Sequence, residues 1–312
     1  MKIVFLDSAT IGSDISLQPI AMLGDFISYQ NTKNEDVINR LEGADVAIVN
    51  KVIITKEIID TCPTLKLICV AATGINNIAV EYAQTKNIEV KNAVNYSTNS
   101  VVQITFGILL EIINKTNAHN DFVKSGKYSQ GKLFTCLEFP FNEISGKRYG
   151  IIGMGNIGKK VAQVAKAFGA EVCYYSTSGN NNSISEYKQL ALDELLSSCD
   201  IISIHAPLNA QTNNLLCENE LKKMKPTAIL MNMGRGGIVN ETDLANALDN
   251  NIIAFAGVDV FTKEPVTLNH PYLTMKNKNR LVLSPHIAWA SIEARKCLVE
   301  KIAENIKASF EM

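Results

Sequence analysis

A glycine-rich turn between an apolar run and a helical pattern is the feature that most constrains the fold. The apolar segment 149–152 leads into Gly-Met-Gly-Asn-Ile-Gly over 153–158, and a helical pattern follows over 159–168. In such a turn the glycines allow a tight bend, close approach of the backbone to a pyrophosphate, and close packing of helix on strand. The N-terminus of the helix offers free N–H groups and a dipole that favours an anion. This strand–turn–helix setting favours a dinucleotide site over a purely structural turn. The expected contacts are Gly153, Gly155, Asn156, Ile157 and Gly158.

Short apolar runs alternate with helical patterns along the chain, which is typical of parallel sheets covered by helices. With 312 residues, the chain is long enough for two domains. Early strands are expected at 2–6, 45–49, 65–71 and 88–90, and a helix over 35–42 whose start carries a capping box between Thr32 and Glu35. After residue 148 we expect six strands, the complement of a Rossmann domain, at 149–152, 171–175, 201–204, 228–231, 254–258 and 281–283.

The order of these elements predicts how the chain is divided. A long apolar helix is expected over 100–117, and an irregular excursion over 119–148. The last helical period, 291–310, follows the sixth strand and is surplus to the Rossmann domain, so we expect it to return to the first domain. The predicted fold is α/β, with two Rossmann-like or flavodoxin-like domains on parallel sheets. They are a discontinuous substrate domain of residues 1–99 plus 287–312, and an NAD(P)-binding domain of residues 100–286.

Charge and cysteine usage argue against several classes of partner. Lys plus Arg number 30 and Asp plus Glu number 31, so no basic excess points to nucleic acid or to an anionic membrane. The seven cysteines are scattered without a C-x-x-C pair, which predicts no metal site and a reducing compartment. The apolar run at the start of the sequence is too short for a signal peptide, so we expect a cytoplasmic protein.

The choice between NAD and NADP depends on the end of the second Rossmann strand. An acidic residue about 20 residues after the glycine turn usually binds the adenosine ribose. Here the strand ends in Tyr174-Tyr175-Ser176, and no Asp or Glu stands there. Ser176 could bond a ribose hydroxyl and would not repel a 2′-phosphate, yet no arginine lies nearby to bind that phosphate. Both cofactors stay open, with NAD favoured.

Three charged or titratable residues follow late strands, where open α/β sheets bind their ligands. Arg235 stands between glycines, where its planar fork suits bidentate capture of a carboxylate. Taken singly, Glu264 could be an ordinary solvated charge on a loop, and His286 could be a core imidazole with its hydrogen bonds satisfied. Together the three residues supply an anion clamp, an orienting carboxylate and a proton donor.

In order and spacing these segments resemble the NAD(P)-dependent D-isomer-specific 2-hydroxyacid dehydrogenases. The resemblance covers essentially the whole chain and rests on the glycine turn, Ser-Ile-His-Ala-Pro-Leu at 203–208, the Arg235 segment, 259–265, and Ser-Pro-His at 284–286. It implies that Arg235, Glu264 and His286 are the catalytic residues. The segment 71–77 resembles the family's substrate loop and is most similar to the glycerate dehydrogenase, or hydroxypyruvate reductase, branch. Ala79 stands where that branch usually has Asp.

The resemblance implies reduction of a small 2-keto acid, such as hydroxypyruvate or glyoxylate, to the D-2-hydroxy acid. NAD(P)H would supply the hydride and His286 the proton, Glu264 would orient the imidazole, and Arg235 would hold the carboxylate and polarise the keto oxygen. The expected substrate contacts are Asn50, Lys51, Thr73, Gly74, Ile75, Arg235, His286 and Trp289. Beyond the glycine turn, the expected cofactor contacts are Thr105, Ser176, His205, Ala206, Pro207, Thr212, Met233, Gly234, Arg235 and Asp259.

Two histidines, His119 and His270, are expected to be structural. Members of the family are commonly homodimers through the long central helix and the arm after it, so the resemblance implies a homodimer. An alternative reading is a dinucleotide-sensing interaction module, similar to the corepressor members of the same family.

Overall fold

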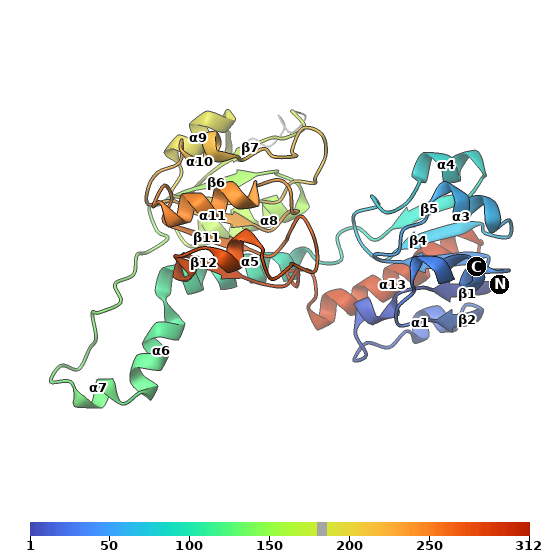
Figure 1. Cartoon of the computed structure of the whole chain (residues 1–312), viewed down its shortest axis with the longest axis horizontal. Coiled ribbons are helices and arrows are strands. Elements are labelled where there is room, and N and C mark those ends of the chain that lie inside the picture. Colours follow the sequence, from blue (N-terminus) through green and yellow to red (C-terminus); the bar gives the residue numbers. More distant parts are fainter. Residues whose placement is uncertain (180–185) are drawn as a thin grey trace. The chain divides into compact units, whose positions relative to one another are not determined.

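The computed structural model describes residues 1–179 and 186–312. The chain forms two compact units, one of residues 1–97 with 289–312 and one of residues 98–288 (Figure 1). Each unit is built on a parallel β-sheet with helices, which confirms the predicted α/β class. None of the helices in the described ranges combines the length and apolar character needed to cross a bilayer.

The first unit contains a five-stranded parallel sheet in the order β2-β1-β3-β4-β5, which is the flavodoxin-like order. Its strands are β1 (Lys2–Phe5), β2 (Asp25–Ser28), β3 (Val46–Val49), β4 (Leu67–Val70) and β5 (Glu89–Asn92). The sequence analysis missed β2. This edge strand exposes or half-exposes every residue, so it lacks the apolar run that marks the buried strands.

The two faces of this sheet bury different apolar sets, because side chains alternate along a strand. Val4 and Leu6 belong to one cluster, and Ile3 and Phe5 to the other. The helices are α1 (Gln18–Ala21), α2 (Val37–Leu41), α3 (Lys56–Thr61), α4 (Val80–Thr85) and α13 (Ile292–Ser309), with 3₁₀ turns at Ser8–Ile11 and Asn34–Asp36. The C-terminal helix belongs to this unit.

The predicted helix over 35–42 is divided into the 3₁₀ turn and α2, and its capping box is wrong. The Thr32 hydroxyl donates to the carbonyl of Leu6 and accepts from Arg40, while the N-cap of the 3₁₀ turn is Lys33 and no side chain caps it. The start of α13 follows the expected rule, since the Ser291 side chain accepts from the N–H of Ala294 at 3.1 Å.

The described residues of the second unit form a seven-stranded parallel sheet in the order β12-β11-β10-β9-β6-β7-β8. The strands are β6 (Arg148–Ile152), β7 (Glu171–Tyr175), β8 (Lys188–Gln189), β9 (Ile201–Ile204), β10 (Ile229–Asn232), β11 (Phe255–Val258) and β12 (Leu281–Leu283). Six were expected, and β8 was missed because two exposed residues carry no apolar signal. The strand at 281–283 is therefore the seventh strand of this sheet, one more than the six of a Rossmann domain. Between β6 and β9 the strand order reverses, which is where such sheets bind dinucleotides.

The helices of this unit include two in the segment expected to be irregular. They are α5 (Thr98–Asn114), α6 (Thr116–Lys124), α7 (Lys127–Gln130), α8 (Asn156–Ala167), α9 (Leu192–Ser198), α10 (Glu218–Leu221), α11 (Glu241–Asp249) and α12 (Pro271–Thr274), with a 3₁₀ turn at Lys278–Arg280. Lys115 adopts a left-handed conformation with φ of 52° and separates α5 from α6. We call residues 116–143, with α6 and α7, the arm; it extends away from the sheet of its own unit (Figure 1).

Candidate active site

The glycine turn at the end of β6 has the close packing and the open space that a dinucleotide needs. Gly153 has φ of 94°, and a Cβ there would lie 2.7 Å from the backbone nitrogen of Ala206. A Cβ on Gly158 would lie 2.3 Å from the carbonyl oxygen of Gly153. A Cβ on Gly155, at the N-cap of α8, meets nothing within 4 Å among the described residues. The space beside Gly155 at the helix N-terminus is therefore open, as a bound pyrophosphate requires.

Two buried polar atoms near this turn also fit a cofactor. Ser176, at the end of β7, is 6% exposed, and its Oγ has no hydrogen-bond partner within the described ranges. The Nδ1 atom of His205, after β9, is likewise buried and unpartnered among those residues, while its Nε2 lies 3.0 Å from Ser203 Oγ. Burial lowers the pKa of His205 to about 3, so the ring is uncharged at neutral pH. Buried polar groups usually have partners, so these two are suited to bonds from a ligand.

Four of the other expected cofactor contacts are buried, and the structure gives hydrogen-bond partners for two of them and close packing for the other two. Thr105 and Thr212 are fully buried, and their hydroxyls donate to the carbonyls of Val101 and Pro207. Met233 is 6% exposed, and a Cβ on Gly234 would lie 2.8 Å from the carbonyl oxygen of Ala206, so these segments pack closely at the strand ends. A cofactor role for these side chains stays a prediction.

The three predicted catalytic residues follow adjacent strands at one edge of the sheet. In the register, Asn232 of β10 pairs with Val258 of β11, and Val258 pairs with Leu283 of β12. Arg235 follows the first of these strands, Glu264 the second and His286 the third. The topology therefore brings to one edge three segments that are far apart in the sequence.

Glu264 and His286 form a direct pair. The His286 Nδ1 atom lies 2.7 Å from Glu264 Oε2, and the side chains are 23% and 26% exposed. Glu264 Oε1 accepts the N–H of Phe261 at 3.0 Å. Because Nδ1 faces a carboxylate, it carries a proton. Nε2 has no hydrogen-bond partner in the described part of the chain, so it is the ring atom that can exchange a proton with a ligand.

The backbone of His286 is held in an uncommon conformation by Asp259. His286 has φ of 54°, a region that costs a non-glycine residue about 1–3 kcal/mol. The Asp259 side chain, 1% exposed, accepts the Ser284 hydroxyl at 2.6 Å and the N–H groups of Ile287 and Ala288 at 2.9 and 3.0 Å. Burial raises the pKa of Asp259, and these donors oppose that shift. Asp259, expected as a cofactor contact, thus fixes the turn that carries the imidazole.

Arg235 carries a cation without a carboxylate partner among the described residues. Its guanidinium donates to the carbonyl of Gly234 at 2.8 Å, and Asn232 Nδ2 donates to the carbonyl of Arg235 at 3.1 Å. The next residue, Gly236, lies against the Glu264 turn, where an added Cβ would come within 2.0 Å of the Phe261 carbonyl carbon. The Arg235 and Glu264 loops are therefore in backbone contact, which only glycine allows.

The expected substrate loop lies in the first unit, and Asp7 organises a neighbouring loop there. The carboxylate of Asp7, 4% exposed, accepts three successive N–H groups, those of Asn50, Lys51 and Val52, at 2.8, 2.6 and 3.1 Å. The sequence analysis missed Asp7, because an Asp after a strand is also typical of an ordinary turn. Asn77 Nδ2 donates to the carbonyl of Val52 at 2.8 Å.

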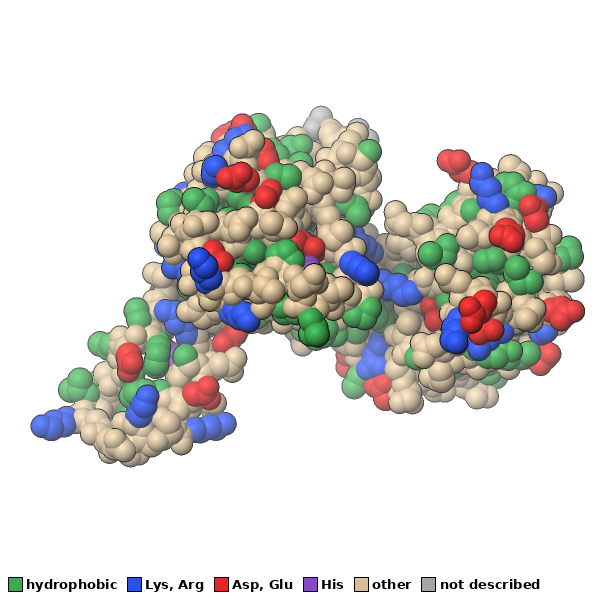
Figure 2. All heavy atoms as spheres, viewed as in Figure 1, with side chains coloured by type: hydrophobic (Ala, Val, Ile, Leu, Met, Phe, Trp, Pro, Cys, Tyr) green, Lys and Arg blue, Asp and Glu red, His purple; other side chains and the backbone are tan. Residues whose placement is uncertain are grey.

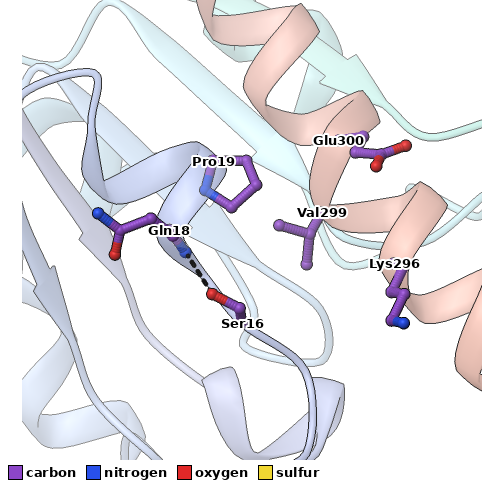
Figure 3. Close-up of a pocket in the computed structure, with 6 residues that line it drawn as sticks. All are labelled: Ser16, Gln18, Pro19, Lys296, Val299 and Glu300. Atoms are coloured by element: carbon purple, nitrogen blue, oxygen red, sulfur yellow. Dashed lines mark hydrogen bonds between the residues drawn. The ribbon is translucent and has the colours of Figure 1, made fainter.

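The remaining substrate candidates of this unit are held by local contacts. Thr73 donates its hydroxyl to the carbonyl of Ala93 at 3.0 Å and accepts at its own carbonyl from Asn92 Nδ2 at 2.6 Å. Trp289 packs edge-on against Tyr96 with ring centroids 6.2 Å apart. A pocket of about 350 Å³ also lies in this unit, between the segment 16–19 and α13 (Figure 3). Its lining residues, among them Val299 and Lys296, include none of the candidate site residues.

Fold and site together define a dinucleotide-dependent oxidoreductase, with a Rossmann sheet, a glycine turn and an Arg, Glu and His at neighbouring strand ends. A sequence profile described as "D-isomer specific 2-hydroxyacid dehydrogenase, NAD binding domain" matches residues 106–288. A hydroxypyruvate reductase of Blautia hydrogenotrophica is 36% identical over 98% of this chain and 96% of its own length. A glycerate dehydrogenase of Methylorubrum extorquens is 33% identical over 98% and 95%.

Among solved structures, an acyclic imino acid reductase in complex with NADPH and D-Arg superposes with a TM-score of 0.88 at 32% identity, covering 100% of this chain and 97% of that one. The chain belongs to the D-isomer specific 2-hydroxyacid dehydrogenase family, as its motifs had indicated, and is an NAD(P)-dependent enzyme.

Proposed function

We propose that the protein reduces a short 2-keto acid, such as glyoxylate or hydroxypyruvate, to the D-2-hydroxy acid. The observation that carries the proposal is the His286–Glu264 pair, whose Nδ1 and Oε2 atoms are 2.7 Å apart, with the Glu264 loop in backbone contact with the Arg235 loop. The names of the two relatives, hydroxypyruvate reductase and glycerate dehydrogenase, support this substrate class.

In this mechanism NAD(P)H supplies the hydride. Arg235 binds the substrate anion and stabilises the negative charge that develops on the keto oxygen. His286 donates the proton of Nε2 to that oxygen, and in the oxidative direction the same atom accepts it. Glu264 holds the ring through Nδ1 and stabilises its positive charge before the proton leaves. We propose that the backbone N–H groups of Thr73, Gly74 and Ile75 also bind the substrate carboxylate. Asn50, Lys51 and Trp289 are proposed as further substrate contacts.

Cofactor oxidation followed at 340 nm tests the proposal, with NADH and NADPH each combined with glyoxylate, hydroxypyruvate and pyruvate. Because a general acid contributes ~10²–10⁴-fold to the rate, His286→Ala is expected to lower kcat by that factor while the Kd for NADH is unchanged. Arg235→Ala is expected to raise KM and lower kcat. His119→Ala, in the arm, is the matched control and keeps its turnover. Normal turnover in His286→Ala contradicts the mechanism. A wild-type protein that binds NADH and reduces none of the keto acids contradicts the proposed substrate class.

We also propose that the arm joins two copies of the chain in a homodimer. The arm exposes several apolar side chains among charged ones (Figure 2), and the most exposed are Val123, Leu133, Phe134, Leu137 and Phe141, between 55% and 90% exposed. Such a patch favours a protein interface. Light scattering after gel filtration should give twice the 34.2 kDa chain mass, and Phe134→Ser with Leu137→Ser should give the monomer. A monomeric wild type contradicts this assignment.

The seven free cysteines support a reducing compartment such as the cytoplasm.

A further inference from the structure

A second carboxylate–imidazole pair lies beside the first in the second unit. His270 Nε2 is 3.0 Å from Glu241 Oε2, and these side chains are only 8% and 15% exposed. Glu241 is the first residue of α11, and His270 is the N-cap of α12. Neither residue has a part in the mechanism above.

The hydrogen bonds define the role of each atom in this pair. His270 Nδ1 accepts the N–H of Tyr272 at 3.2 Å, so the ring proton resides on Nε2 and is donated to Glu241. The ring is enclosed by Phe261 and Tyr272, with centroid distances of 5.8 and 4.9 Å. One oxygen of Glu241 is thus held in a fixed direction by a buried, rigid donor.

The other oxygen of Glu241 reaches the loop that carries Glu264. Glu241 Oε1 accepts the N–H of Thr262 at 2.7 Å, and the preceding N–H, that of Phe261, donates to Glu264 Oε1 at 3.0 Å. Two consecutive peptide groups are therefore held by two different glutamates. One glutamate is anchored on His270, and the other contacts His286.

We propose that Glu241 and His270 are positioning residues that fix the Phe261–Glu264 turn, so that the Glu264 carboxylate meets His286 Nδ1. The proposal deepens the function given above and rests on it. Charge-assisted bonds to a carboxylate are short and directional, so the Glu241–Thr262 bond limits the movement of the turn. Without the Glu241–Thr262 bond the turn can shift, and the Glu264 carboxylate then moves out of hydrogen-bonding position relative to His286 Nδ1.

The test compares Glu241→Ala with Asp243→Ala. Asp243 lies in the same first turn of α11 and bonds the N–H of Glu218 at 3.0 Å, away from the Phe261–Glu264 turn. Glu241→Ala is expected to lower kcat about 10- to 100-fold, the scale on which a displacement of up to ~1 Å reduces catalysis. Asp243→Ala is expected to keep kcat within about twofold, as for a substitution away from the site. Glu241→Gln keeps one acceptor oxygen but turns an NH2 donor toward the N–H of either Thr262 or His270 Nε2, so it is expected to recover only part of the loss.

Two readouts separate positioning from a general loss of structure. In a Glu264→Gln background, Glu241→Ala should add less than about a twofold loss, because residues acting through one path are not additive. The ring resonances of His286, followed by NMR, should move in Glu241→Ala toward their positions in Glu264→Gln. Unchanged kcat in Glu241→Ala, or losses that multiply in the double variant, overturns the proposal. The NMR comparison needs no turnover, so it tests the positioning even if the proposed reaction is wrong.

Discussion

Replacing Gly236 with alanine tests whether the Arg235 and Glu264 loops act as one unit. The added Cβ would lie 2.0 Å from the carbonyl carbon of Phe261 and 2.2 Å from the nitrogen of Thr262. An ordinary contact for a Cβ begins at 3.4 Å, so the loops must separate by about 1.4 Å (3.4 minus 2.0) at this point. The obstructing atoms are backbone, so a rotating side chain cannot relieve the clash.

The size of the effect follows from this displacement. A misplacement of about 1 Å in a catalytic group costs on the order of 100-fold in rate. We therefore expect Gly236→Ala to lower kcat about 100-fold, which is about 2.7 kcal/mol of transition-state stabilisation. Overpacking should also lower the free energy of unfolding by about 1–3 kcal/mol. The glycine turn at 153–158 is not touched, so the Kd for NADH should change far less than kcat.

The neighbouring Gly237→Ala is the control. Gly237 has φ of 81°, so alanine is strained there, but its Cβ would meet nothing nearer than 3.5 Å among the described residues. It should destabilise the fold by roughly 1–2 kcal/mol and leave kcat far less affected. Steady-state kinetics, NADH titration and urea denaturation measure all three quantities. Wild-type kcat in Gly236→Ala, or an equal loss of kcat in both variants, would refute the coupling of the loops.

Three further predictions concern other parts of the molecule. Burial lowers the pKa of His205 to about 3 from its ordinary 6.5, so only the unfolded chain gains this proton as the pH falls below 6.5. Between pH 6.5 and 4.5 this group should therefore lower the free energy of unfolding by about 2 kcal/mol. In His205→Gln, urea denaturation should show a pH-dependent loss of unfolding free energy that is smaller by this amount. Equal losses in the wild type and the variant contradict the prediction. Ser176→Asp should raise kcat/KM for NADH relative to NADPH by introducing a ribose acceptor that repels a 2′-phosphate, and an unchanged ratio would place the ribose elsewhere. Asp7→Asn should lower stability by about 2 kcal/mol and raise the keto-acid KM, because the carboxylate holds three N–H groups of the 50–52 loop. Trp289 fluorescence during unfolding and substrate titration test this, and no change in either quantity rejects it.

The strands that contain short apolar runs could be predicted from the sequence, and the elements without an apolar pattern could not. Strands β9 and β12 have the expected bounds, because Ile201–Ile204 and Leu281–Leu283 are short apolar runs between polar segments. The edge strands β2 and β8 lack such runs, because β2 begins and ends with polar residues and β8 consists of two exposed polar residues. The edge strand β12 could be predicted because all three of its residues are apolar. The two helices of the arm were missed for a similar reason: α6 buries no residue, so it has no apolar stripe facing a core.

The site shows the same division between local and distant signals. The glycine turn and the positions of Arg235, Glu264 and His286 could be identified by motif, and the adjacency of the last three follows from strand order. The supporting residues could not. Asp7 acts on N–H groups 43 to 45 residues away. Glu241 and His270 meet across 29 residues, and only a folded backbone brings them together.

The place of α13 in the first unit has a consequence for biosynthesis. Leu298, Ile302 and Ile306 are fully buried in a cluster that also contains Ile3 and Phe5 of β1. The ribosome makes β1 to β5 first and α13 last, with the whole of residues 98–288 between them. Ile11, Ile15 and Ile20 cover part of this face early, but at ~5–20 residues per second the part beneath α13 stays uncovered for roughly 10–40 s in the nascent chain. A chaperone that recognises apolar surface has this interval in which to bind, and it must leave before the last helix can dock.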